Sequence, residues 1–223
     1  MTLLENISIV QISCGDAHTV ALSSDGKLYS WGGGGCGQLG HPDTNQMPKD
    51  EDGCPYQPKP KLISALKNLK VKEIACGKAH TVAVITNGNL YSWGAGACGQ
   101  LGHPDTSSFP SDEDGYPFQP IPRFVHALKN VFVIHASCGD VHTMVLTSKG
   151  EVYCFGGGSC GQLGLGDIST LPLDVDQCPF MPEPQKIEEL KNEFVVSVSC
   201  GDSHSMALTK LGVVYAWGEA TCG

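Results

Sequence analysis

The chain has 223 residues, of which 41% are hydrophobic and 17% charged, and its net charge is −9. This composition is typical of a globular protein with a sizeable core, and the acidic balance argues against indiscriminate binding to nucleic acid or anionic membranes. The first residues lack the basic and apolar segments of a secretory signal, and no apolar run reaches the ~18 residues of a membrane span. Eleven cysteines without such a signal predict reduced thiols in the cytoplasm or nucleus.

A segment that begins with Cys-Gly-Asp-Ala-His recurs with a constant spacing of 62 residues. The repeated histidines are His18, His80, His142 and His204, each preceded by a cysteine at Cys14, Cys76, Cys138 and Cys200. An aromatic residue keeps the same register at Trp31, Trp93, Phe155 and Trp217, and so does a second cysteine at Cys36, Cys98, Cys160 and Cys222. We therefore interpret residues 1–223 as one domain of repeat units 12–73, 74–135, 136–197 and 198–223.

One repeat, taken in chain order, reads as short strands. Val71–Ala75 and the apolar run Thr81–Thr86 predict two strands, Asn87-Gly88 predicts a hairpin turn, and Asn89–Trp93 predicts the returning strand. A further strand is expected near Pro60–Ile63. Ala65–Lys70 is the best candidate for a helical turn. About four antiparallel strands per unit, repeated radially, predict an all-β propeller with about 3.5–4 blades.

The glycine-rich stretch WGGGGCGQLG at 31–40 places Gly32, Gly34 and Gly37 at the spacing of a dinucleotide-binding loop. Such a loop must open a helix whose N-terminus meets the pyrophosphate, but Gly40 and Pro42 follow here and prevent that helix. The stretch also recurs in the next two repeats, whereas one binding domain needs it once. We expect these glycines to supply positive φ angles and close approach between blades.

These segments resemble the regulator of chromosome condensation repeat family, whose repeat runs through Cys-Gly-x-x-His, an apolar strand, Tyr-x-Trp-Gly and Gly-Gln-Leu-Gly. The resemblance covers nearly the whole chain and implies a seven-bladed propeller that serves as a binding platform. The founding member of the family is a guanine-nucleotide exchange factor for the small GTPase Ran. Other members lie within ubiquitin ligases, kinases and a plant UV-B photoreceptor, so the fold does not fix the function.

Seven blades of this length would need about 430 residues. We therefore expect this chain to be part of a longer propeller, or a short variant that closes its ring by association, because unpaired strand edges invite pairing with other chains. The photoreceptor's sensing tryptophans lie beside the histidine in a Gly-Trp-Arg-His-Thr motif. At those positions this chain has Asp16-Ala17, Lys78-Ala79, Asp140-Val141 and Asp202-Ser203. Photoreception by that mechanism is not supported.

The Cys and His residues of the repeats could in principle bind zinc, form disulfides such as Cys14–Cys36, or act as nucleophile and base. The paired C-x-x-C spacing of zinc sites is missing, and a catalytic site needs one asymmetric copy rather than four equivalent ones. We expect an architectural role instead, with the histidines bonded to backbone carbonyls, the cysteines packed as small apolar residues, and the aromatic residues between blades. We predict no catalytic residue, metal or cofactor.

Three long connections, 41–58, 103–120 and 165–182, contain most of the negative charge. Their acids are Asp43, Asp50, Glu51, Asp52, Asp105, Asp112, Glu113, Asp114, Asp167, Asp174 and Asp176, against the single base Lys49. The constant period places all three on one face of the propeller. The candidate contact residues are Asp50, Glu51, Asp52, Tyr56, Asp112, Glu113, Asp114, Tyr116, Phe118, Asp174, Asp176 and Phe180.

Acidic residues beside aromatic ones could form a rim that attracts a basic protein surface. The alternatives are plain solvated loops and a calcium site, although the alternating pattern and closing glutamate of an EF-hand are absent. We interpret the protein as a non-enzymatic interaction scaffold. Two further hypotheses are an exchange factor for a Ran-like GTPase, for which no copy has a distinctive insertion, and a substrate-recruiting propeller of a larger ubiquitin ligase.

Overall fold

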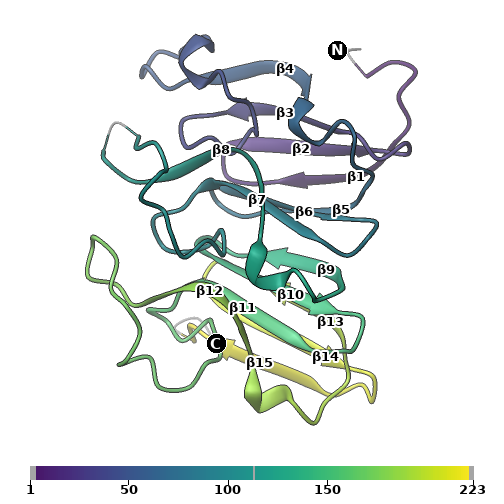
Figure 1. Cartoon of the computed structure of the whole chain (residues 1–223), viewed down its shortest axis with the longest axis vertical. Coiled ribbons are helices and arrows are strands. Elements are labelled where there is room, and N and C mark those ends of the chain that lie inside the picture. The colour runs from purple at the N-terminus through teal and green to yellow at the C-terminus, as the bar shows by residue number, and fades with distance from the viewer. Residues whose placement is uncertain (1–3, 113, 221–223) are drawn as a thin grey trace.

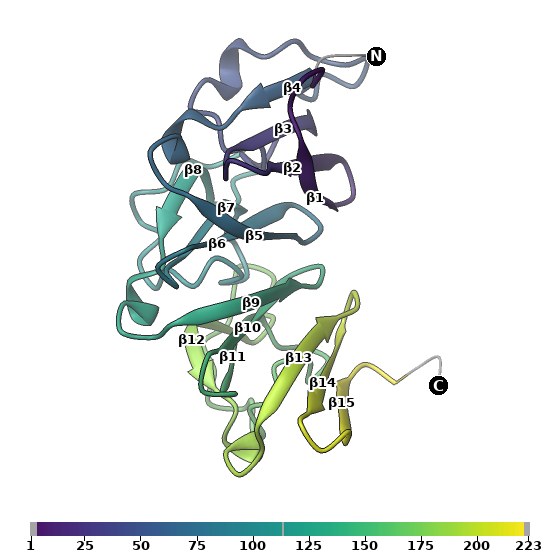
Figure 2. The same ribbon diagram turned by 90° about the vertical axis from the view of Figure 1, so that its right-hand side faces the viewer.

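The computed structural model describes residues 4–112 and 114–220 and consists of blades arranged in an arc (Figure 1, Figure 2). Three blades are four-stranded antiparallel sheets and the last described blade has three strands. The all-β propeller predicted from the repeats is confirmed. The first strand of each blade is β1 (Ile9–Cys14), β5 (Val71–Cys76), β9 (Val133–Cys138) or β13 (Val195–Cys200).

The second and third strands form a hairpin around the predicted turn glycines. The second strands are β2 (His18–Ser23), β6 (His80–Ile85), β10 (His142–Thr147) and β14 (His204–Thr209). The third strands are β3 (Leu28–Gly33), β7 (Leu90–Ala95), β11 (Val152–Gly157) and β15 (Val214–Gly218). The turns between them contain Gly26, Gly88, Gly150 and Gly212, all at positive φ. These hairpins agree with the sequence prediction to within one or two residues.

The fourth strands are β4 (Tyr56–Leu62), β8 (Phe118–Phe124) and β12 (Phe180–Lys186). They begin earlier than expected from Pro60 because the ladder to the third strand continues past an irregularity, as in Gly33 paired with Tyr56. The predicted helical turn is a 3-10 helix repeated in each connection: η2 (Ser64–Leu66), η3 (His126–Leu128) and η4 (Glu188–Leu190). A further 3-10 helix, η1 (Thr44–Gln46), lies in the first long loop.

The cores lie between blades rather than within one. The first core combines Val20 and Leu28 of the first blade with Ile74, Ala83 and Trp93 of the second blade. Burial of such apolar surface is the main favourable term in folding, so the blades stabilise one another. The blades run from first strand to fourth strand. The boundaries chosen for the repeat units, at residues 12, 74, 136 and 198, fall inside the first strands.

Candidate partner-binding face and the joints between blades

A chain of hydrogen bonds joins each blade to the next at the repeated histidine. His18 Nε2 lies 2.9 Å from the Thr81 hydroxyl of the following blade, and that hydroxyl donates to the Gln38 carbonyl at 3.0 Å. The same arrangement links His80, Thr143 and Gln100, and again His142, Ser205 and Gln162. The expectation that these histidines bond to backbone carbonyls is therefore wrong: each reaches a hydroxyl on the next blade.

The direction of these bonds fixes the form of the histidine ring. The Thr81 hydroxyl has one proton and gives it to Gln38, so His18 must donate from Nε2. The Nδ1 atoms of His18, His80 and His142 are buried and have no hydrogen-bond partner among the described residues. Burial lowers the pKa of His80 to about 3 and the pKa of His142 to about 4, so both rings are neutral at pH 7.

The glycine that follows the repeated cysteine is required by contact. A Cβ at Gly139 would lie 2.2 Å from Cε1 of His142 and 2.5 Å from the Gly201 carbonyl of the next blade. In the glycine-rich stretch, Gly37 has φ +73° and its Cβ would meet Phe118 and Pro120 of the next blade at 2.8 Å. Gly37 thus has both expected properties, positive φ and close approach to the next blade. Gly32 has positive φ but lies against Ala17 of its own blade, and Gly34 has neither property.

Trp93, Phe155 and Trp217 pack in the cores between blades, as predicted, whereas Trp31 belongs to none of these cores. Trp93 is fully buried in the first core, and its indole donates to the Gln38 carbonyl at 2.9 Å. Phe155 occupies the same place in the second core but has no donor, and Trp217 packs against the third. Trp31 is half-buried. The Gln38 carbonyl thus accepts two hydrogen bonds, from Thr81 and Trp93, whereas the Gln100 carbonyl accepts that of Thr143.

Ten cysteines lie within the described residues and all are free thiols, while Cys222 lies outside them. Cys76, Cys138 and Cys200 pack beside the cores, and burial raises the pKa of Cys76 and of Cys200 to about 12. A thiol with so high a pKa is a poor nucleophile and metal ligand. Over the described residues, no group of three His, Cys, Asp or Glu side chains could hold a metal ion. His204 is exposed at the last blade.

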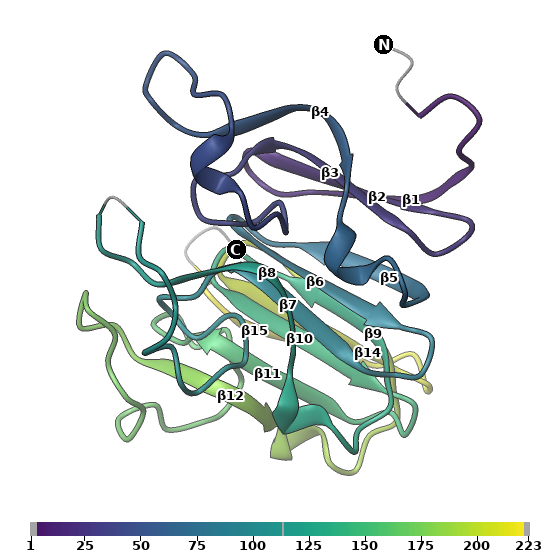
Figure 3. The same ribbon diagram turned by 45° about the horizontal axis from the view of Figure 1, so that its top comes forward.

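The three long loops project from the same side of the molecule, at the left of Figures 1 and 3. Each ends in a small hairpin whose strands meet in an isolated bridge: Lys49 with Pro55, Ser111 with Pro117, and Leu173 with Pro179. Asp50 Oδ1 closes the first tip by accepting the backbone N–H groups of Asp52 and Cys54, at 3.1 and 2.8 Å. Asp112 and Asp174 accept the equivalent pairs.

The candidate contact residues therefore fall into separate groups. Asp50, Asp112 and Asp174 shape the tips, whereas Glu51, Asp52, Asp114 and Asp176 are exposed on them. Glu113 lies outside the described residues. The structure thus presents a row of acidic hairpin tips on one face.

The aromatic candidates are placed differently. Phe118 is only 8% exposed, and it and Phe180 start fourth strands packed on Gly37 and Gly99 of the preceding blades. Tyr56 is half-buried at the equivalent position. Tyr116 belongs to the tip, and its hydroxyl donates to Asp176 of the neighbouring loop at 3.2 Å. Phe118 therefore holds the loop in place, and Tyr116 ties two tips together.

Sequence reasoning missed two apolar residues on the third tip, Leu173 and Val175, which are 54% and 68% exposed. The first two tips have Lys49 and Glu51, and Ser111 and Glu113, at these positions, so comparison of the repeats contained the signal. It also missed the anchors Met47 and Phe109, which are buried under their loops. The third tip differs from its sisters by being apolar as well as acidic.

The comparisons with known proteins agree with this architecture. A model of the RCC1-like domain matches residues 1–223. The chain belongs to the RCC1-like domain family. Among RCC1-like relatives, it is 38% identical over 212 residues to human E3 ubiquitin-protein ligase HERC2, covering 94% of this chain and 4% of HERC2. It is 36% identical over 220 residues to the ultraviolet-B receptor UVR8 of Arabidopsis thaliana, covering 98% of this chain and 43% of UVR8.

Solved RCC1-like propellers have the same fold. Prp20p of Saccharomyces cerevisiae, described with its binding properties to Gsp1p and histones, is 27% identical with a TM-score of 0.75, over 96% of this chain and 46% of Prp20p. Yeast RCC1 (Prp20) bound to Kap60 is 26% identical with a TM-score of 0.74, over 96% of this chain and 44% of that one. The chain thus spans less than half the length of these relatives.

Proposed function

We propose that the face bearing the acidic tips binds a basic segment of a protein partner, and that the chain is a non-enzymatic interaction module. The observation that supports this most is the repetition of one hydrogen-bonded tip three times on the same side. Each tip is closed by an aspartate that accepts two backbone N–H groups, so the turns that carry Asp52, Asp114 and Asp176 are shaped before a partner arrives. Preorganised charge of one sign speeds the encounter with an oppositely charged surface.

The chemistry of the joints supports the non-enzymatic part of the proposal. His18, His80 and His142 are neutral, buried and bonded to hydroxyls, and Cys76, Cys138 and Cys200 have raised pKa values. General base or nucleophilic catalysis would need such groups accessible and poised near neutral pH. Free thiols throughout the described residues suit a reducing compartment, which supports a cytoplasmic or nuclear location. The described part of the chain contains no helix long and apolar enough to cross a membrane.

Core histones are a suitable basic probe because Prp20p, a solved propeller of the same fold, is described as binding histones. We expect the 223-residue chain to bind purified core histones with an affinity that falls as salt increases. The double variant Asp52→Asn/Asp114→Asn removes two exposed tip acids outside the tip-closing bonds, and we expect it to weaken binding roughly 3- to 30-fold.

The matched control is Glu188→Gln/Glu189→Gln. It removes the same charge from exposed residues of η4, at the opposite end of β12 from the long loop. Fluorescence anisotropy at 50 and 300 mM salt measures both variants. Histone binding that is insensitive to salt, or weakened equally by the two variants, would contradict the proposal.

Guanine-nucleotide exchange is the second candidate function, because Prp20p is described as binding Gsp1p. Exchange requires an element that enters the nucleotide site, and the repeats of this chain align at 62 residues without a distinctive insertion. Release of labelled nucleotide from Gsp1p, with and without the chain, distinguishes the two functions. Acceleration of release would favour exchange over a purely docking role. Recruitment of substrates to a ubiquitin ligase, suggested by HERC2, would use the same acidic face.

A further inference from the structure

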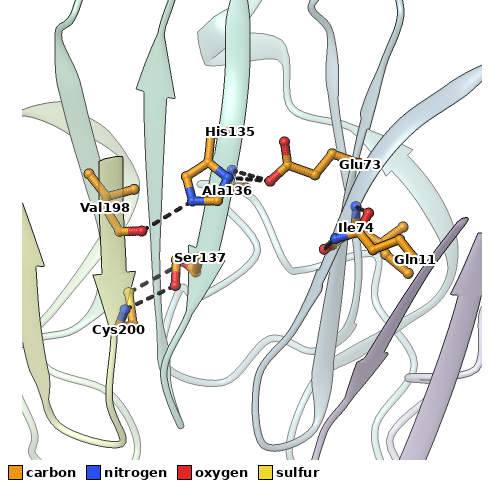
Figure 4. A network of polar contacts seen from close by, with 8 residues as sticks. All are labelled: Gln11, Glu73, Ile74, His135, Ala136, Ser137, Val198 and Cys200. Carbon is orange, nitrogen blue, oxygen red and sulfur yellow. Dashed lines mark hydrogen bonds and ion pairs between the residues drawn. The ribbon is translucent and has the colours of Figure 1, made fainter. Parts of the chain in front are cut away.

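The first strands of successive blades lie side by side, and one position on them differs in chemistry from blade to blade (Figure 2). The residues at this position, 62 apart, are Gln11, Glu73, His135 and Ser197. Figure 4 shows that Gln11, Glu73 and His135 each reach toward the next blade. The contact between blades at this level is therefore not uniform, unlike the repeated histidine joint.

Between the first two blades the contact is neutral. Gln11 Nε2 donates to the Ile74 carbonyl at 2.9 Å, and the Ile74 N–H donates to Gln11 Oε1 at 3.0 Å. An amide side chain has both a donor and an acceptor, so it satisfies the backbone of the neighbouring strand without a change of protonation. This joint is independent of pH.

Between the second, third and fourth blades the contact needs a charge. The Glu73 carboxylate faces His135 Nδ1 and accepts the Ala136 N–H at 3.4 Å (Figure 4). His135 Nε2 lies 3.1 Å from the Val198 carbonyl. Both ring nitrogens thus face oxygens that have no proton to give, and a neutral imidazole has only one N–H. The imidazolium alone satisfies both partners.

We propose that His135, held as an imidazolium between Glu73 and the Val198 carbonyl, is a pH-sensitive coupling that joins three successive blades and weakens when the ring loses its proton. Its partners come from β5 on one side and β13 on the other. Glu73 and His135 also belong to the two blades whose long loops are tied by Tyr116 and Asp176. The coupling does not depend on the proposed histone-binding role.

Few other groups titrate in this environment. The charged or titratable residues on the strands packed against β9 are Lys72, Glu73 and Cys76 of β5, His80 of β6, His142 of β10 and Cys200 of β13, with Cys138 on β9 itself. Burial lowers the pKa values of both histidines and raises those of the three cysteines, so all five are neutral between pH 5 and 8. Lys72 is exposed. Glu73 is therefore the acid that stabilises the imidazolium.

The hydrogen bond that His135 donates to Glu73, opposed by partial burial, raises the pKa of His135 above its ordinary 6.5. A group whose pKa is higher in the folded state adds stability that is complete below the unfolded pKa and disappears as pH rises through the folded pKa. The coupling is thus complete below pH 6.5 and is lost as pH rises through the raised pKa of His135.

Nuclear magnetic resonance of the ring nitrogens of the 223-residue chain tests this directly. We expect His135 to titrate with a midpoint above 6.5, with both nitrogens protonated below it, and Glu73→Gln to move the midpoint to 6.5 or lower. Glutamine already occupies the equivalent position of the first blade, where Gln11 bonds to the neighbouring strand without a charge. A midpoint at or below 6.5 in the unaltered chain, or the same midpoint in Glu73→Gln, would overturn the proposal.

Urea unfolding provides a second readout that does not depend on the glutamate variant. Between pH 6 and pH 8.5, the unfolding midpoint of the unaltered chain should fall by more than that of His135→Gln. The control is His126→Gln, which replaces an exposed histidine and should keep the pH dependence of the unaltered chain. Equal pH dependence in the His135 variant and the unaltered chain would also overturn the proposal.

Discussion

Replacing Thr143 by valine tests the hydrogen-bond chain between blades at its most vulnerable copy. The substitution keeps the shape of the side chain but removes the hydroxyl. His80 Nε2 then loses its acceptor, and the Gln100 carbonyl loses the donor that Thr143 supplied. A buried polar group left without a partner costs about 1–3 kcal/mol, so two of them predict a loss of about 2–6 kcal/mol.

The same substitution one blade earlier is a matched comparison. In Thr81→Val, His18 loses its acceptor, but the Gln38 carbonyl still accepts the indole N–H of Trp93. Only one group is left unsatisfied, which predicts a loss of about 1–3 kcal/mol. The difference between the two sites arises because the second core has Phe155 where the first has Trp93.

Urea unfolding at pH 7, followed by tryptophan fluorescence and circular dichroism, measures both variants. Thr143→Ser is the control, because Ser205 performs the same role in the next joint. We expect Thr143→Ser to be the most stable of the three variants, Thr81→Val to be intermediate and Thr143→Val to be the least stable. A Thr143→Val variant no less stable than Thr81→Val, or a serine variant as unstable as the valine, would refute the reasoning.

Two further predictions concern the same joints. In urea unfolding, Gly139→Ala should destabilise the chain by about 1–3 kcal/mol through overpacking, because the new Cβ would lie 2.2 Å from His142. Gly35→Ala is the control: its Cβ would have its nearest neighbour at 4.0 Å, so its stability should stay within about 0.5 kcal/mol of the unaltered chain. Equal effects would contradict the steric explanation. Acid should also destabilise the fold: the pKa values of His18, His80 and His142 are lowered, so the unfolded chain binds more protons and stability falls from about pH 6.5 toward 4. Unfolding midpoints that stay constant between pH 7 and 5 would contradict it.

The repeat period made most of the fold predictable. Turn glycines such as Gly88 and apolar runs such as Thr81–Thr86 depend on neighbours in the sequence, so local patterns located the hairpins. The phase of the blades was harder to predict, because a period fixes the length of a unit and not where it begins. The actual blades begin at β1, β5, β9 and β13.

The partners of the repeated histidines could not be predicted because they depend on packing between blades. His18 meets Thr81, 63 positions away, and no local pattern indicates that contact. The same holds for His135, whose two partners lie on different blades. Phe118 appeared to be a surface anchor because it follows an acidic, proline-rich stretch, yet it is buried against Gly37. Sequence placed the acidic loops on one face but did not reveal their hairpin tips.

The joints between blades require His18, His80 and His142 to be neutral donors. Nitrogen chemical shifts of His18, His80 and His142 at pH 7 test this requirement most directly. The geometry predicts the neutral ring with its proton on Nε2 at all three, unchanged by an equimolar addition of zinc. Rings protonated on Nδ1, charged rings, or signals that shift with zinc would contradict it.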